Sequence, residues 1–112
     1  MEKRTINFTV KEIISWETAN EFITLETTVP LQIGSETSSR IRLKLKYDSS
    51  MRLPQIKEGD IITIRGLEEN HSGIRKLAEG SIHIPNAALY EEVIIHAGDR
   101  KVNNQVDRKS VV

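Results

Sequence analysis

With 112 residues, the chain is long enough for one domain with a modest hydrophobic core. Its 16 basic and 16 acidic residues give a net charge of zero, which weighs mildly against a nucleic-acid binder but leaves room for local charge to attract one. The lack of cysteine excludes disulfides and thiolate metal sites, and the sequence shows neither a signal peptide nor a membrane-spanning run, so we expect a cytoplasmic protein.

The first two predicted elements are β-strands at 5–14 and 21–29, because apolar and polar residues alternate in both with the period of a strand. A short polar stretch at 15–20 joins them, so we expect an antiparallel hairpin. In the second strand Phe22 points outward, and Pro30 ends the strand. The residues expected on its inward side are Ile23, Leu25, Thr27 and Val29.

After a polar loop at 34–39, the segment 40–47 alternates most strictly of all. We predict a third strand with one apolar face and one wholly basic face. The basic side chains are Arg40, Arg42, Lys44 and Lys46. The apolar side chains are Ile41, Leu43, Leu45 and Tyr47, and we expect all four in the core.

The next segment opens at 48–50 and has room for one short helical turn. Ile62 and Ile64 then form the inward pair of a fourth strand. The connection at 68–73 resembles a hairpin turn, and it leads into a fifth strand at 74–84. Within that strand the residues expected to face the core change from odd-numbered to even-numbered positions around Gly80, which indicates a bulge.

The end of the domain is predicted to be a short helix at 86–97, with Asn86 as its cap and Gly98 after its last residue. A strand over 92–96 is the competing interpretation. The polar segment 99–112 lacks any periodicity, so we expect a flexible tail there.

Five short strands interrupted after the third match the order of the OB-fold, a small Greek-key barrel that binds oligonucleotides or oligosaccharides across its second and third strands. We therefore predict an all-β, OB-fold-like domain over residues 1–98. An SH3-like barrel or another small β-sandwich would fit the same pattern.

A family resemblance lies in the second half of the chain, in Lys57-Glu-Gly-Asp-Ile-Ile-Thr-Ile-Arg-Gly-Leu67 and the following Gly73-Ile-Arg-Lys-Leu77. This run resembles strands four and five of OB-fold domains, in particular those of bacterial single-stranded DNA-binding proteins and their primosomal relatives. The resemblance implies non-catalytic binding of single-stranded DNA with little sequence preference. The chain departs from that family in two respects. It lacks the acidic tail with an apolar tip, and it has only one Trp, two Tyr and two Phe where the family offers several stacking aromatics.

The candidate binding surface is the outer face of the third strand, where OB-folds bind their ligands. Its four cations would span about 20 Å, enough to follow a few phosphates. Phe22 offers a ring on which bases can stack, and Trp16 either contacts ligand from the first loop or caps the barrel. The competing interpretation is a solvated sheet face on which Glu21 and Glu26 pair with the cations. Three further cations would extend the track: Arg65, Arg75 and Lys76.

We predict no catalytic site, metal site or cofactor. The histidines His71, His83 and His96 are scattered, although His83 points outward on the fifth strand and would add to the surface. No nucleophile elbow and no glycine-rich phosphate loop is present, so no small-molecule substrate is expected. Two other functions remain open: binding of single-stranded RNA, and a protein-interaction or assembly module whose basic strand meets an acidic partner. Homo-oligomers would multiply the basic strands on one ligand.

Overall fold

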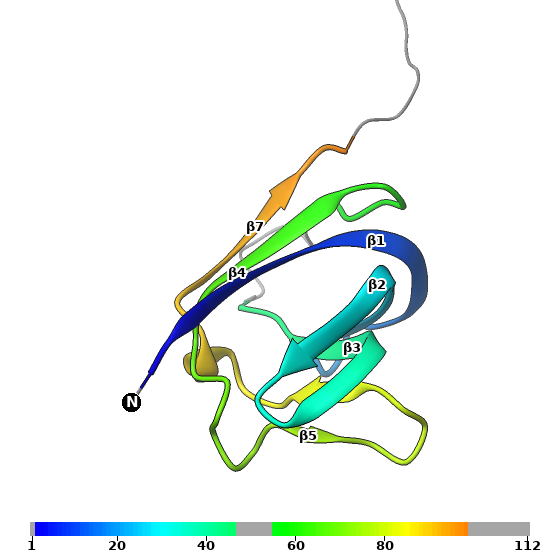
Figure 1. Cartoon of the computed structure of the whole chain (residues 1–112). Coiled ribbons are helices and arrows are strands. Elements are labelled where there is room, and N and C mark those ends of the chain that lie inside the picture. The colour runs from blue at the N-terminus through cyan, green and yellow to red at the C-terminus, as the bar shows by residue number, and fades with distance from the viewer. Residues whose placement is uncertain (1, 47–54, 99–112) are drawn as a thin grey trace, which may run out of the picture.

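The computed structural model describes residues 2–46 and 55–98, which form a mixed sheet of seven strands (Figure 1). The order of the strands across the sheet is β5-β6-β3-β2-β1-β4-β7. The strands are β1 (Arg4–Glu17), β2 (Phe22–Ile33), β3 (Glu36–Lys44), β4 (Ile61–Leu67), β5 (Arg75–Lys76), β6 (Ile82–Ile84) and β7 (Glu92–His96). The all-β prediction is therefore confirmed.

Strand β1 belongs to both halves of the sheet. Its first part, up to Thr9, pairs antiparallel with β4, whereas its second part, from Val10 onward, pairs antiparallel with β2. The register of the β1–β2 ladder shifts twice, between Val10 and Glu12 and between Ile13 and Ser15. Such irregularities bend a strand, and Figure 1 shows β1 as the most strongly curved element. The bend allows one strand to enclose a core from two sides.

The connections follow a Greek-key order. Strands β1, β2 and β3 pair as consecutive antiparallel neighbours, and β4 then lies beside β1, so that the spatial order is 4-1-2-3. Strand β6 lies on the other side of β3 and is parallel to it, with Ile41, Arg42 and Leu43 of β3 opposite Ile82, His83 and Ile84. The outer positions of the sheet are taken by β5 and β7.

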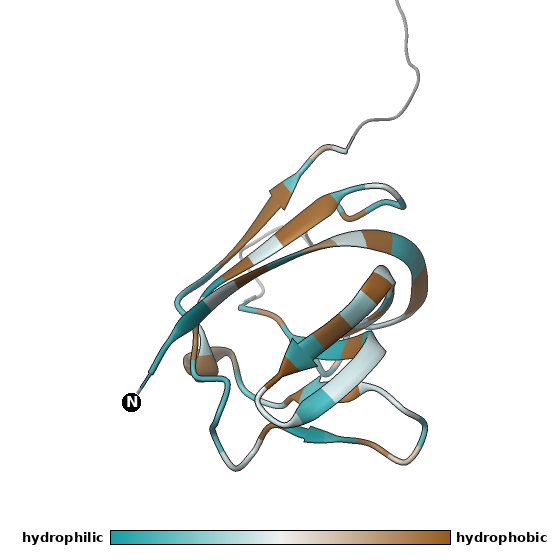
Figure 2. Ribbon diagram, in the orientation of Figure 1, coloured by the Kyte–Doolittle hydropathy of each residue, from teal (hydrophilic) through white to brown (hydrophobic). Residues whose placement is uncertain are grey.

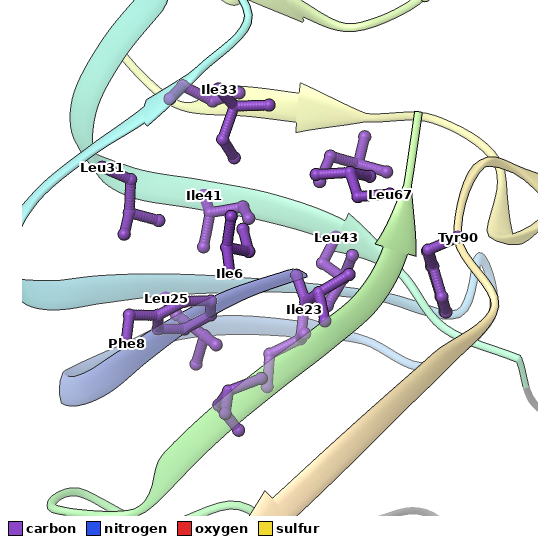
Figure 3. Packing of buried hydrophobic residues seen from close by; sticks show 14 of the residues in the cluster. Ile6, Phe8, Ile23, Leu25, Leu31, Ile33, Ile41, Leu43, Leu67 and Tyr90 are labelled. Atoms are coloured by element: carbon purple, nitrogen blue, oxygen red, sulfur yellow. The ribbon is translucent and has the colours of Figure 1, made fainter. Parts of the chain in front are cut away.

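The core lies on the concave side of the sheet, and β3 shows why. Ile41, Leu43 and Leu45 are 0%, 1% and 4% exposed, respectively, as the alternation predicts. Figure 2 shows the matching bands of apolar and polar residues along the strands. In Figure 3 the apolar side chains of β1, β2, β3 and β4 point toward one another, and Tyr90 closes one end of the cluster. The opposite side of β3 is therefore free to carry polar groups.

The second and third strands extend further than predicted. Strand β2 continues through Pro30 to Ile33, and β3 begins at Glu36, so the predicted loop at 34–39 is shorter in the structure. The β2–β3 register shifts between Glu26 and Leu31. Proline lacks a backbone donor and fits at such an irregularity. The shift also explains why Val29 is 59% exposed and not inward as predicted.

The predicted fifth strand is two short strands joined by a tight turn. Gly80 has a φ of +107° and its N–H donates to the carbonyl of Leu77. Gly80 therefore lies in the turn of a β5–β6 hairpin and not in a bulge. The predicted hairpin turn at 68–73 is also wrong, because β4 pairs with β1 and β7 and not with β5.

The predicted helix at 86–97 is wrong, and the competing interpretation matches the structure. Asn86 does cap a helical turn by accepting a hydrogen bond from the N–H of Ala88, but this 3₁₀ turn, η1 (Ala87–Leu89), has only three residues. Strand β7 follows and pairs antiparallel with β4. Its central residues are all β-branched (Val93, Ile94 and Ile95), which favours a strand once a neighbouring edge is free to pair.

Some predictions fall outside the described residues. These are the inward position of Tyr47, the short helical turn at 48–50 and the flexible tail at 99–112. Within 2–46 and 55–98, no helix is long and apolar enough to cross a membrane.

The burial pattern of β2 and β3 predicts which side chains destabilise the domain when they are shortened to alanine. Leu43→Ala should lower the free energy of unfolding by about 2–5 kcal/mol, because it leaves a cavity in a close-packed core. Val29→Ala, the matched control on the exposed shift region, should change it by less than about 0.5 kcal/mol. Urea unfolding followed by circular dichroism measures both. Equal losses would contradict the assigned orientation of the two strands.

Candidate nucleic-acid interface

Strands β2, β3 and β6 bring three planar side chains together on the outward side of the sheet. Arg42 of β3 lies directly opposite His83 of β6, and Phe22 of β2 lies opposite Lys44 of β3. The guanidinium carbon of Arg42 is 3.8 Å from the centre of the Phe22 ring, and Lys44 Nζ is 5.0 Å from it. The rings of Phe22 and His83 stack with their centres 5.4 Å apart. We call Phe22, Arg42 and His83 the planar cluster.

Arg42 is fixed in this cluster by Glu17, at the end of β1. Its Nε donates to one carboxylate oxygen at 2.9 Å and its Nη2 to the other at 2.7 Å. A bidentate pair of this kind fixes the plane of the guanidinium as well as its position. The hydrogen bond from Arg42 lowers the pKa of Glu17, and the same bond raises the pKa of Arg42. Both groups therefore stay charged over the whole physiological range.

His83 is neutral in this arrangement. Its Nδ1 lies 3.2 Å from Nη1 of Arg42, and a guanidinium can only donate, so Nδ1 accepts and the ring proton is on Nε2. His83 as a whole residue is only 8% exposed. Burial lowers the pKa of His83, and the positive charges of Arg42 and Arg75 lower it further. His83 contributes a neutral ring, not a third cation.

The other cations of β3 also face carboxylates. Lys44 Nζ lies 3.6 Å from Glu21 and donates to the carbonyl of Asn20 at 2.6 Å. Arg40 lies 3.8 Å from Glu26. The competing interpretation of the sequence expected pairing by Glu21 and Glu26, and this pairing is present. The outward face of β3 is therefore balanced in charge and not wholly basic.

The remaining predicted site residues do not all join this face. Lys46 lies beyond the end of β3, where its Nζ donates to the carbonyl of Glu91 and lies 5.2 Å from the Tyr90 ring. Arg65 of β4 lies in the other half of the sheet and forms ion pairs with Glu91 and Glu92. These two cations would not extend a track along β3.

Of the two positions that the sequence left open for Trp16, ligand contact or packing against the barrel, the structure shows the second. Trp16 lies opposite Ile23 in the β1–β2 ladder and packs, half-buried, against the core.

Arg75 and Lys76 of β5 do extend the face. Arg75 is exposed and lies opposite His83, so it continues the row of Arg42, whereas Lys76 donates to the carbonyl of Thr37 at 2.8 Å.

The sequence did not predict Glu17 as a site residue, because only its position in the folded sheet brings its carboxylate to Arg42. Glu17 ends β1 opposite Phe22 of β2, and β2 separates it from the strand of Arg42, so no local spacing connects the two residues. A polar hollow of about 250 Å³ borders the face, lined by Glu26, Ser38, Ser39, Arg40, Glu79 and Gly80. Across residues 2–46 and 55–98, no three His, Asp or Glu side chains are grouped to hold a metal ion.

A scan against protein-family models found no match, and searches of the curated proteins and of the solved structures found none either.

The buried imidazole predicts a pH dependence of stability. The unfolded chain takes up a proton on His83 below about pH 6.5, whereas the folded chain resists it because its pKa is lowered. The contribution of His83 to the free energy of unfolding should therefore be fully present above about pH 6.5, and the free energy of unfolding should fall as the pH drops toward 5. Glu17 has a lowered pKa, so its contribution is lost only below about pH 4.5.

The measurement is urea unfolding between pH 5 and pH 7.5 for the natural chain and for His83→Gln. The variant should be less stable at neutral pH but should lose the part of the slope between about pH 5 and pH 6.5. A natural chain whose stability is flat across this interval would contradict the assignment of a neutral, buried His83.

Proposed function

We propose that this chain is an OB-fold-like domain that binds single-stranded DNA without catalysis and with little sequence preference, in an accessory role in replication or in a plasmid or phage. The Greek-key order and the parallel β3–β6 pair support an OB-like arrangement, although no backbone ladder between β4 and β6 closes the described sheet into a barrel. The observation that carries the proposal is the planar cluster, because it lies on the outward side of β2 and β3.

Bases bind such a surface through their flat faces. Unpaired bases stack on aromatic rings and on guanidinium planes, and each stacked base contributes about 1–3 kcal/mol regardless of its identity. Phe22 and Arg42 supply a ring and a guanidinium in two adjacent rows of the sheet, and the buried ring of His83 packs beside Phe22. This geometry suits a ligand whose sequence does not matter.

Phosphates would replace the carboxylates as partners of the cations. The ion pairs of Arg40 and Lys44 are partly exposed, and pairs of that kind contribute only about 0–1 kcal/mol, so exchanging them costs little. The net attraction is small for the same reason, and the proposal therefore includes a modest affinity. With three phosphate contacts, the logarithm of the association constant should fall with the logarithm of the salt concentration with a slope of about −2.

The direct test is a titration with oligo-dT monitored by the fluorescence of Trp16, which adjoins Glu17. Binding should be present at low salt and should weaken with a slope of about −2. Absence of binding at low salt would overturn the proposal. A parallel titration with oligo-U separates DNA from RNA as the preferred ligand.

Two substitutions separate stacking from charge. Phe22→Ala should weaken oligo-dT binding about 5- to 150-fold at an unchanged salt slope, which corresponds to the loss of one stacked base. Lys44→Gln should reduce the magnitude of the slope by about 0.7. Lys57→Gln removes an exposed cation away from β3 and serves as the matched control.

An interaction with a protein is the second candidate, and the charge balance of the face favours it. Arg40, Arg42 and Lys44 alternate with carboxylates from β1, β2 and their connection, which is the mixed pattern of a protein-binding surface rather than of a phosphate track.

Glu17→Gln distinguishes the two candidates. It removes the carboxylate that competes for Arg42, so oligo-dT binding should tighten several-fold if phosphate takes that place. Equal or weaker oligo-dT binding, in a variant whose circular dichroism is unchanged, would favour the protein partner.

A further inference from the structure

The two edges of the sheet are protected to very different extents. Edge strands expose unpaired backbone groups, and natural proteins blunt them with short length, lysine, proline or a bulge. Strand β5 follows this rule, because it has two residues and both are cations, Arg75 and Lys76. Strand β7 has five residues and none of these devices in its centre. Across the described residues, no strand pairs with its outer side.

The side chains of β7 are also incompletely covered. Val93 and Ile95 lie opposite Ile64 and Ile62 of β4, which are fully buried, yet both residues of β7 are only partly buried. Ile94 faces outward opposite Thr63 and is partly exposed. A groove of about 360 Å³ runs beneath the strand, with a lining that includes Leu45, Tyr90, Val93 and Ile95. Apolar surface therefore remains open along this edge.

The sequence of β7 is complementary to itself when two copies run antiparallel. Pairing centred on Ile94 places Glu92 of one copy opposite His96 of the other, at both ends of the ladder. Val93 then lies opposite Ile95, and Ile94 lies opposite its own copy. A shift of the centre to Val93 or to Ile95 would place Glu92 or His96 opposite Ile94 and lose both Glu92–His96 contacts, so a single register is favoured.

We propose that β7 is the interface of a two-fold homodimer, in which two copies of this chain join their sheets through an antiparallel β7–β7 ladder centred on Ile94. The occupant of the edge is a second copy because the strand matches itself, with a Glu92 carboxylate opposite a His96 imidazole at both ends and apolar residues between them. The contact is isologous, so it closes after two subunits and leaves no free β7 edge. It involves neither β2 nor β3, so it does not depend on the proposed binding of DNA.

The residue on the two-fold axis gives the sharpest test, because it meets its own copy. The full chain should have twice its mass of 12.7 kDa in sedimentation equilibrium at tens of micromolar. Ile94→Lys places two like charges in contact on the outward side and should yield a monomer. Val29→Lys, an exposed apolar position on β2, is the matched control and should remain a dimer.

The absence of cysteine from the sequence allows a second assay that does not depend on the lysine variant folding. Directly opposite residues of an antiparallel pair have Cα atoms about 4.5–5.5 Å apart, within the range that a disulfide bridges. Ile94→Cys should therefore form a covalent dimer under mild oxidation, whereas Val29→Cys should not. A monomeric natural chain, a dimer that survives Ile94→Lys, or equal cross-linking of the two cysteine variants would each overturn the proposal.

Discussion

The fold depends on one constraint, which is that β1 forms backbone ladders with two different strands. Its first part is paired with β4 and its second part with β2, and the register shifts that follow Val10 bend it between the two. Without this bend the apolar faces of β3 and β4 would not meet across a common core. The same strand then ends at Glu17, whose carboxylate reaches Arg42 on the outward side of β3. One element thus shapes the core and orients the candidate binding surface.

The ion pair between Glu17 and Arg42 defines the character of that surface. It holds the guanidinium over Phe22 and beside His83, and it neutralises the cation at the same time. A face built in this way offers flat groups more readily than it offers free positive charge. This is why the proposed binding of single-stranded DNA relies on stacking, and why a neutral chain remains compatible with it.

Local patterns in the sequence were sufficient to predict part of this structure. The alternation along 40–47 predicted both sides of β3 correctly at Ile41, Leu43 and Leu45, because the period of a strand depends only on neighbouring residues. The first hairpin and the outward position of Phe22 followed in the same way. The strand β7 was predicted as a helix because Asn86 is a typical helix cap, but in the structure Asn86 caps only the 3₁₀ turn at Ala87–Leu89 and Gly98 follows a strand. Pairings between distant segments, such as His83 with Arg42 and Glu17 with Arg42, are long-range contacts that no local spacing encodes.

The central claim is that single-stranded DNA binds across β2, β3 and β6, and backbone amide NMR tests it most directly. Addition of unlabelled oligo-dT to the isotope-labelled chain should shift the amide signals of Phe22, Arg42 and His83 and their neighbours on these strands. Signals from β7, on the far edge of the sheet, should stay in place. A spectrum that does not change at low salt, or shifts confined to β4 and β7, would contradict the account.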